Sequence, residues 1–312
     1  MILVQSNVRE TGEKINMEHL IQKDILLESY TSIKAGGRAE YIAQPENYEE
    51  LSGLLAWALD QQQDVNILGS GTNTLISEKG VEGLLIDIKK LRKVHTRGTL
   101  LTAYAGSSME SVVKAAGDAG LSGLEYFSGL PGTVGGAVYG NAGCFGHEVA
   151  DLIEWIEYMT PDGEMHKMRK DQYLFTYRGS PCKCNGWIIT EVGFNLTPKP
   201  SIEIQDKAKG YRQKRRDMGH YRYPSLGSIF KNPSIEGIDE RISAGKLIDE
   251  AGLLGHAVGA AKIAEYHGNI IINPKGEAKS DDIYQLIEYI QMQVKKKHDI
   301  ALELEINLLG NW

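Results

Sequence analysis

Two glycine-rich stretches offer the kind of backbone from which a ligand site is built. Residues 124–146 read LEYFSGLPGTVGGAVYGNAGCFG and contain seven glycines from Gly129 to Gly146. Glycine loses more conformational freedom on folding than other residues, so this density indicates a backbone shape that side chains forbid, or a ligand close to main-chain amides. A glycine-rich surface loop is the alternative, but the apolar residues Val134, Ala137 and Val138 are untypical of a solvated loop. We expect this stretch to hold a ligand.

The second stretch is Gly69-Ser70-Gly71-Thr72-Asn73-Thr74, which follows a short strand-like run at residues 65–68. Successive amides in such a turn can curl around a diphosphate, and the serine, threonine and asparagine side chains add hydrogen bonds. A tight turn between two strands uses the same residue types and remains an alternative. The stretch is neither a Walker loop nor a dinucleotide fingerprint that opens a helix. Two amide-rich turns in one chain favour a shared ligand.

Charged and nucleophilic side chains give three further candidates. Six basic residues fall within residues 207–216, as either a solvated helix face or a cationic wall for a phosphorylated substrate. Ser228 lies in a turn without the G-x-S-x-G pattern of hydrolases, so by itself it is an ordinary turn serine. Glu303 and Glu305 alternate with apolar residues in a predicted final strand at 300–308, and this periodicity does not say which of them is chemical.

Composition excludes several classes of function. The chain has 312 residues and a formal net charge of -7, which argues against a nucleic-acid binder. The three cysteines, Cys144, Cys182 and Cys184, form no disulfide framework, and no metal-ligand pattern is present. No apolar run is long enough to span a membrane, and residues 1–14 lack the pattern of a signal peptide. We therefore expect a cytoplasmic protein without a metal, and no obligate protein partner is evident.

Helical and strand-like patterns alternate along the chain and predict an α+β fold. A helix starting at Asn47 buries a face that includes Leu51 and Leu59, and a second helix follows a capping box of Ser107 and Glu110. The segment 30–45 resembles a hairpin, as does 152–168, and a strand follows at 187–196. Prolines at 198 and 200 indicate a boundary. Beyond it we expect a helix at 242–251, a strand at 270–272 and a helix at 280–298.

Seven segments, in this order, are similar to one known family. They are TSIKAGGRAEYIAQP, LGSGTNTLI, GLPGTVGGAVYGNAG, YRGS, GSIFKNP, AGKLIDEAGL and LELEI, which together span most of the chain. The chain resembles the UDP-N-acetylenolpyruvoylglucosamine reductases, the MurB family of peptidoglycan synthesis. The short path from Tyr177-Arg178 to Ser228 resembles the compact subtype of that family, which lacks a longer insertion over the substrate.

The resemblance implies an α+β, FAD-binding fold of the vanillyl-alcohol-oxidase type. Two subdomains, divided near residues 76–80, would form the FAD-binding region 1–198, and residues 199–312 would form an α+β substrate-binding domain. The implied contacts with non-covalently bound FAD are Gly69, Ser70, Gly71, Thr72, Asn73, Thr74, Pro131, Gly132, Thr133, Gly135, Gly136, Asn141 and Gly143.

The implied reaction is the NADPH-dependent reduction of an enolpyruvyl ether on a UDP-sugar to a lactyl ether. Hydride addition to the terminal alkene carbon leaves negative charge beside the substrate's carboxylate, and the family's catalytic residues match Arg178, Glu305 and Ser228. The first two would stabilise the carboxylate, for which Glu305 needs a raised pKa, and Ser228 would donate the proton. Implied substrate contacts are Tyr177, Arg215, Lys231 and Asn232.

Three departures from the family pattern concern the flavin and uridine contacts. Gly140 stands where many relatives carry a larger residue, Gly146-His147-Glu148 where a second glycine is common, and Tyr223-Pro224 where Gln-Pro is frequent. Two alternatives stay open. A covalent-flavin oxidase of the same superfamily would often carry a histidine in the turn at 69–74, which has none, and a non-catalytic flavin or UDP-sugar binder would lack one of the three catalytic residues.

Overall fold

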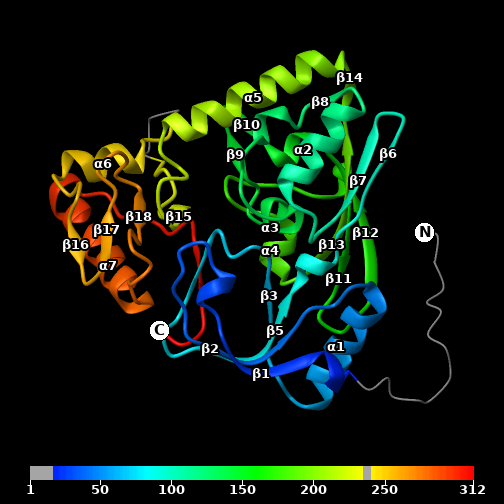
Figure 1. Ribbon diagram of the computed structural model, residues 1–312, viewed down its shortest axis with the longest axis horizontal. Coiled ribbons are helices and arrows are strands. Elements are labelled where there is room, and N and C mark those ends of the chain that lie inside the picture. The colour runs from blue at the N-terminus through cyan, green and yellow to red at the C-terminus, as the bar shows by residue number, and fades with distance from the viewer. Residues whose placement is uncertain (1–16, 235–239) are drawn as a thin grey trace.

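The computed structural model describes residues 17–234 and 240–312, and Figure 1 shows three lobes that meet at its centre. Residues 1–14, for which we predicted no signal peptide, lie outside the described residues. All three lobes combine helices with sheets, and most strand pairs are antiparallel, so the predicted α+β class is confirmed. Within the described ranges, no helix is both long and apolar enough to cross a membrane.

The first lobe is a four-stranded sheet in the order β1-β2-β5-β3. β2 runs antiparallel to β1 and parallel to β5, which is also parallel to β3. One helix, α1, is capped by Asn47, whose side chain accepts a hydrogen bond from the Glu50 amide, as predicted. The bounds are β1 (Ile21–Leu26), β2 (Arg38–Ala43), α1 (Tyr48–Asp60), β3 (Val65–Leu68) and β5 (Val81–Asp87).

Two local predictions in this lobe are wrong. The segment before Gly36 forms a 3-10 turn at Glu28–Tyr30 instead of the first arm of a hairpin, and β2 pairs with β1. Leu59 is 74% exposed, because it lies off the stripe that buries Leu51 and Leu54. β5 belongs to this sheet, which therefore includes residues up to Asp87, and the division near residues 76–80 stays a prediction.

The second lobe is a five-stranded antiparallel sheet in the order β12-β11-β13-β7-β6. The predicted hairpin at 152–168 is confirmed by β11 and β12, and the predicted strand at 187–196 by β13. The cap of α2 is Ser108, which accepts from the Ser111 amide, and not Ser107. The bounds are β6 (Val94–Arg97), β7 (Leu100–Tyr104), α2 (Met109–Asp118), α3 (Val134–Tyr139), β11 (Ile153–Met159), β12 (Met165–Arg169), α4 (Pro181–Asn185) and β13 (Ile188–Asn195).

The basic helix α5 (Ser201–Asp217) continues this second lobe across the predicted boundary at residue 198. It lies along α2 in Figure 1, and a Cβ added at Gly117 of α2 would be 3.6 Å from Gln205. The preceding pair, β14 (Thr197–Pro198), hydrogen-bonds with β8 (Leu121–Ser122). This packing favours a boundary after Asp217.

The third lobe contains an antiparallel sheet in the order β15-β18-β17-β16, covered by α6 and α7. Ile283, Leu286, Ile287, Ile290 and Val294 of α7 are buried, which confirms the predicted helical stripe. Its elements are β15 (Ser225–Ser228), α6 (Ala244–Glu250), β16 (Ala257–Val258), β17 (Ala261–Ile263), β18 (Ile270–Ile272) and α7 (Ser280–His298).

The segment after α7 does not form the continuous strand predicted at 300–308. Leu304 makes a single bridge to Phe230, and only Asn307–Leu309 (β19) form a strand. β19 pairs in parallel with β4 (Thr74–Ile76), directly after the glycine turn at 69–73. The chain therefore returns from the third lobe to the first.

Candidate active site

The two glycine-rich stretches are neighbours in space. A Cβ added at Gly69 would lie 2.6 Å from the Thr133 hydroxyl, and one at Gly132 would lie 3.2 Å from the Thr72 hydroxyl. Thr72 also donates to the Pro131 carbonyl at 3.4 Å. Gly71 has φ +60 and approaches the Tyr30 carbonyl, where no side chain fits. The two turns thus form one surface.

Two predicted cofactor contacts have packing roles. Gly135 lets α3 approach β7, because an added Cβ would lie 2.9 Å from the Ala105 side chain. Asn141 is completely buried, and its amide nitrogen donates to the Glu148 carboxylate at 2.8 Å and the Thr176 carbonyl at 3.0 Å. Both residues support the surface from behind, and their contact with a cofactor stays a prediction.

Arg178 and Glu305 meet between the second and third lobes. The Arg178 Nε lies 2.6 Å from the Glu305 Oε1, and their side chains are only 19% and 16% exposed. Arg178 occupies a two-residue turn closed by mutual backbone bonds between Thr176 and Gly179, and its φ of +57 is in the left-handed region. Gly143 leaves room for it, since an added Cβ would lie 2.9 Å from the Arg178 Nη1.

Ser228 ends β15 beside the Glu305 segment. The residue after it, Ile229, accepts a hydrogen bond from the Glu305 amide at 2.8 Å. On the other side, the Asn73 side chain donates to the Glu305 carbonyl at 3.1 Å. The backbone of Glu305 is therefore held both by the segment that carries Ser228 and by the glycine turn at 69–74.

Burial dominates the electrostatics of Glu305. It raises the pKa of this carboxyl above its usual value, although Arg178, Lys183 and Lys231 each oppose the shift. The raised pKa expected for Glu305 is thus present. Glu303, by contrast, forms an exposed ion pair with Lys231 at 3.3 Å. The two glutamates, indistinguishable by periodicity, differ in burial and in partner.

Lys183 is a residue of this site that sequence reasoning missed. It lies on α4, with its ammonium 5.8 Å from the centre of the Tyr139 ring. Burial, followed by the charge of Lys231, lowers its pKa. The available signal was the position of Lys183 five residues after Arg178, in a short helix that Ser180 caps.

The remaining predicted substrate contacts flank the same pair. Tyr177 precedes Arg178, and its hydroxyl accepts from the Asn232 amide at 3.3 Å. The Asn232 side-chain oxygen accepts from the Ala244 amide at 3.0 Å. Lys231 and Asn232 thus extend the site from the third lobe.

The basic segment is mostly a solvated face of α5, with Arg215 as the exception. Lys207, Lys209, Lys214 and Arg216 are exposed, and Arg212 pairs with Glu110. Arg215 is only 7% exposed, and its Nε and Nη2 have no hydrogen-bond partner among the described residues.

Arg215 provides the test of whether a cofactor fits this site. Its guanidinium lies 5.2 Å from the Phe145 ring and close to Cys144, at the end of the glycine-rich stretch 124–146. A buried cation with free donors requires an anionic or hydrogen-bond-accepting partner. A flavin nucleotide has both kinds of group, so these residues fit it. No cluster of possible metal ligands occurs within the described part of the chain.

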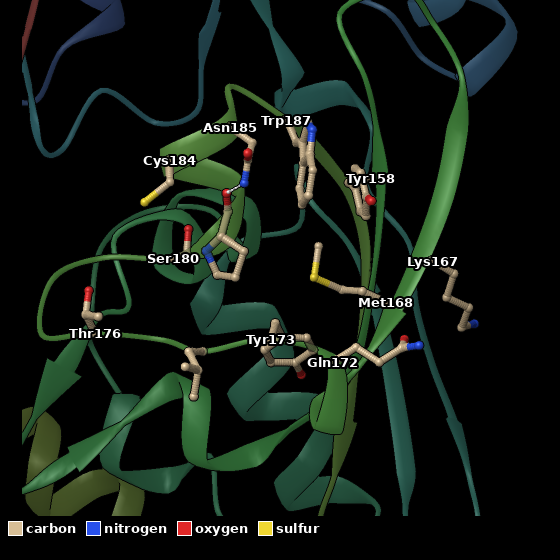
Figure 2. A pocket seen from close by; sticks show the side chains of 12 residues that line it. Tyr158, Lys167, Met168, Gln172, Tyr173, Thr176, Ser180, Cys184, Asn185 and Trp187 are labelled. Atoms are coloured by element: carbon tan, nitrogen blue, oxygen red, sulfur yellow. Dashed lines mark hydrogen bonds between the residues drawn. The ribbon is translucent and has the colours of Figure 1, made fainter.

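A cavity of about 560 Å³ lies behind the turn that carries Arg178. Figure 2 shows Thr176 and Ser180 at one edge and the aromatic residues Tyr158 and Trp187 at another. These two rings are stacked with centroids 4.3 Å apart. Arg178 and Glu305 do not line this cavity, so the predicted site is separate from it.

Comparisons with known proteins agree with this arrangement. Residues 39–169 match the family described as FAD binding domain, and residues 219–309 match the C-terminal domain of UDP-N-acetylenolpyruvoylglucosamine reductase. The chain is 37% identical to the reductase of that name from Caldanaerobacter subterraneus subsp. tengcongensis, over 91% of this chain and 92% of the relative. It is 36% identical to the one from Agathobacter rectalis, over 99% of both chains.

A solved structure is also similar. The crystal structure of UDP-N-acetylenolpyruvylglucosamine reductase (MurB) from Thermus caldophilus matches with a TM-score of 0.78 and 33% identity, covering 93% of this chain and 100% of that one. The fold and site define a flavoprotein oxidoreductase whose cofactor is FAD. The chain belongs to the UDP-N-acetylenolpyruvoylglucosamine reductase family.

Proposed function

We propose that the protein reduces UDP-N-acetyl-3-O-(1-carboxyvinyl)-glucosamine to UDP-N-acetylmuramate, a precursor of peptidoglycan, with NADPH as reductant. The observation that carries the proposal is the buried pair of Arg178 and Glu305, which joins two lobes beside the surface of the two glycine turns. The two glycine turns would hold FAD, which would supply the hydride chemistry that connects NADPH with the terminal alkene carbon of the substrate.

Arg178 is proposed to bind the substrate's carboxylate, on which negative charge grows as the alkene is reduced. A guanidinium is suited to this because its planar donors match a carboxylate and it stays charged. Binding would draw Arg178 from Glu305, and the loss of that cation raises the pKa of Glu305 further. A protonated Glu305 then donates a hydrogen bond to the same carboxylate.

Ser228 is proposed to donate the proton to the carbon that carries the negative charge. A hydroxyl is a weak acid, but a carbanion is a strong base, and a fixed geometry makes the transfer effective. The attachment of the next residue, Ile229, to the Glu305 backbone at 2.8 Å supports this assignment, because it fixes Ser228 next to the glutamate segment.

The proposed partners are small molecules, the UDP-sugar and NADPH, with Tyr177, Arg215, Lys231 and Asn232 as contacts. These residues all belong to the described chain, and we propose no obligate protein partner. We place the activity in the cytoplasm, where NADPH is available to the enzyme.

One experiment tests the proposal as a whole. NADPH added anaerobically to the purified yellow protein should bleach the flavin absorbance, and the enolpyruvyl sugar nucleotide should restore it. UDP-N-acetylglucosamine, which lacks the alkene, is the matched control and should not restore it. A flavin that stays reduced with both compounds would identify a non-catalytic relative. Denaturation should release free FAD, and retained flavin would identify a covalent attachment.

A further inference from the structure

Tyr177 joins the turn of Arg178 to the third lobe through Arg241. The Arg241 guanidinium carbon lies 4.0 Å from the centre of the Tyr177 ring. Its Nη1 donates to the Asn232 carbonyl at 3.2 Å, while the Asn232 amide donates to the Tyr177 hydroxyl at 3.3 Å. Three residues thus form a closed set of contacts, which we call the Tyr177 clamp.

The turn at 176–179 is supported at its tip from the third lobe. Arg178 is in the left-handed region, which costs free energy for a residue with a side chain. The base of the turn is held from its own lobe, where Asn141 donates to the Thr176 carbonyl. From the third lobe, the tip is held by the Arg178–Glu305 pair and by the Tyr177 clamp.

These two contacts differ during the reaction. In the proposed function, the substrate's carboxylate takes Arg178 away from Glu305. The ion pair between the lobes is then weakened at the moment when the position of Arg178 matters most. The Tyr177 clamp includes Tyr177 and Asn232, which are proposed substrate contacts. It does not use the side chains of Arg178 or Glu305, which are proposed to bind the carboxylate, so opening of that pair leaves its contacts in place.

We propose that Arg241 is a positioning residue, which holds Arg178 in place through Tyr177 while the Arg178–Glu305 pair is open. This proposal rests on the proposed function. Arg241 itself does not touch the substrate. Its stacking over the ring requires a cation, and its bond to the Asn232 carbonyl requires a donor at a fixed distance, so lysine is a partial replacement.

The test is a double-mutant cycle on the holoenzyme, followed by stopped-flow absorbance of the flavin. Arg241→Ala should slow reoxidation by the enolpyruvyl substrate about 10- to 100-fold, the effect of a small misplacement of a binding group. Its limiting rate should fall while the substrate's Kd changes little, and bleaching by NADPH should stay near the wild-type rate. Arg241→Lys should recover part of the loss. Lys23→Ala removes a similar stacked cation, 5.2 Å from the Tyr41 ring in the first lobe, and should have no effect.

The cycle then uses Tyr177→Leu, which removes the ring. If Arg241 acts through Tyr177, adding Arg241→Ala to Tyr177→Leu should slow reoxidation by less than about twofold more. If the rate losses of Arg241→Ala and Tyr177→Leu multiply in the double mutant, the two residues act independently and the proposal is overturned. If Arg241→Ala changes only the substrate's Kd, with an effect that grows at low salt, Arg241 binds the substrate directly and the proposal is also overturned. If the wild-type flavin is still reoxidised by the enolpyruvyl substrate, such a result would leave the proposed function unaffected. Failure of the wild type to be reoxidised would overturn both.

Discussion

Asn141 provides a demanding test of how the site is supported. It is completely buried, has φ +43, and makes three hydrogen bonds through its side chain. The amide nitrogen donates to the Glu148 carboxylate and the Thr176 carbonyl, and the oxygen accepts from the Ala150 amide at 3.3 Å. Asn141→Ala removes all three bonds, which are partly buried, and leaves their partner groups without a replacement from this side chain.

The expected loss follows from these contacts. The bond to the carboxylate contributes about 1.5–3 kcal/mol and each of the other two about 1 kcal/mol. Alanine in a left-handed conformation costs roughly 1 kcal/mol more than asparagine. The free energy of unfolding should therefore fall by about 4–6 kcal/mol, and the Tm of the holoenzyme by on the order of 10 °C.

Thermal unfolding and the two flavin half-reactions measure the consequence. Asn141→Gly also removes the three bonds, but glycine adopts the left-handed conformation without strain. The Tm of Asn141→Gly should therefore be slightly higher than that of Asn141→Ala. Asn185→Ala, which loses a single exposed bond to the Pro181 carbonyl, is the control and should lose about 1 kcal/mol. Because Thr176 forms the base of the Arg178 turn, reoxidation by substrate should slow more than reduction by NADPH. A Tm within about 2 °C of the wild type would refute the energetic argument, and equal slowing of both halves would refute the link to Arg178.

Four further predictions concern the site itself. Glu305→Gln should slow substrate reduction by several orders of magnitude and Glu303→Gln hardly at all, because only Glu305 is buried against Arg178. Steady-state rates in the reverse order would mean that the wrong glutamate is assigned. Because the pKa of Glu305 is raised in the folded state, this group stabilises the fold at pH values below the ordinary carboxyl range, and the stabilisation is lost as pH rises through the folded pKa. The free energy of unfolding of the wild type minus that of Glu305→Gln should therefore decline with rising pH. A difference that stays constant with pH in urea titrations would contradict this. Ser228→Ala should bind FAD and be bleached by NADPH normally, yet be reoxidised ~10²–10⁴-fold more slowly, and unchanged stopped-flow traces would assign the proton to another donor. Arg215→Gln should weaken retention of FAD or substrate in equilibrium dialysis, whereas Lys207→Gln on the solvated face should not, and equal affinities would show that the buried guanidinium has no ligand.

Local patterns predicted the elements well where burial follows periodicity. The stripe of α7 and the cap at Asn47 were legible because both depend on residues three or four apart. The final segment was not, because Leu302 and Ile306 alternate like a strand although only a bridge at Leu304 and the pairing of β19 anchor the backbone. Alternation of apolar and polar residues indicates which side chains are buried, but a strand also requires a partner strand.

The site shows a similar division. The resemblance brought Arg178 and Glu305 together over 127 residues of sequence, which no local pattern could do. It could not show that Gly135 and Asn141 also have packing roles, because packing and ligand binding both require small or amide side chains. The resemblance singled out Arg215 among six basic residues, which charge alone could not do, since charge does not reveal which position of a helix is buried.

The parallel pairing of β19 with β4 has a consequence for biosynthesis. The backbone directly after the glycine turn at 69–73 obtains its strand partner from residues 307–309, and Asn73 bonds to Asn307 as well as to Glu305. On the ribosome, residues 74–76 emerge long before that partner exists, so this edge waits until residues 307–309 have been made. Completion of the cofactor surface is thus tied to the synthesis of β19, and chains that stop before residue 307 lack the strand partner of residues 74–76.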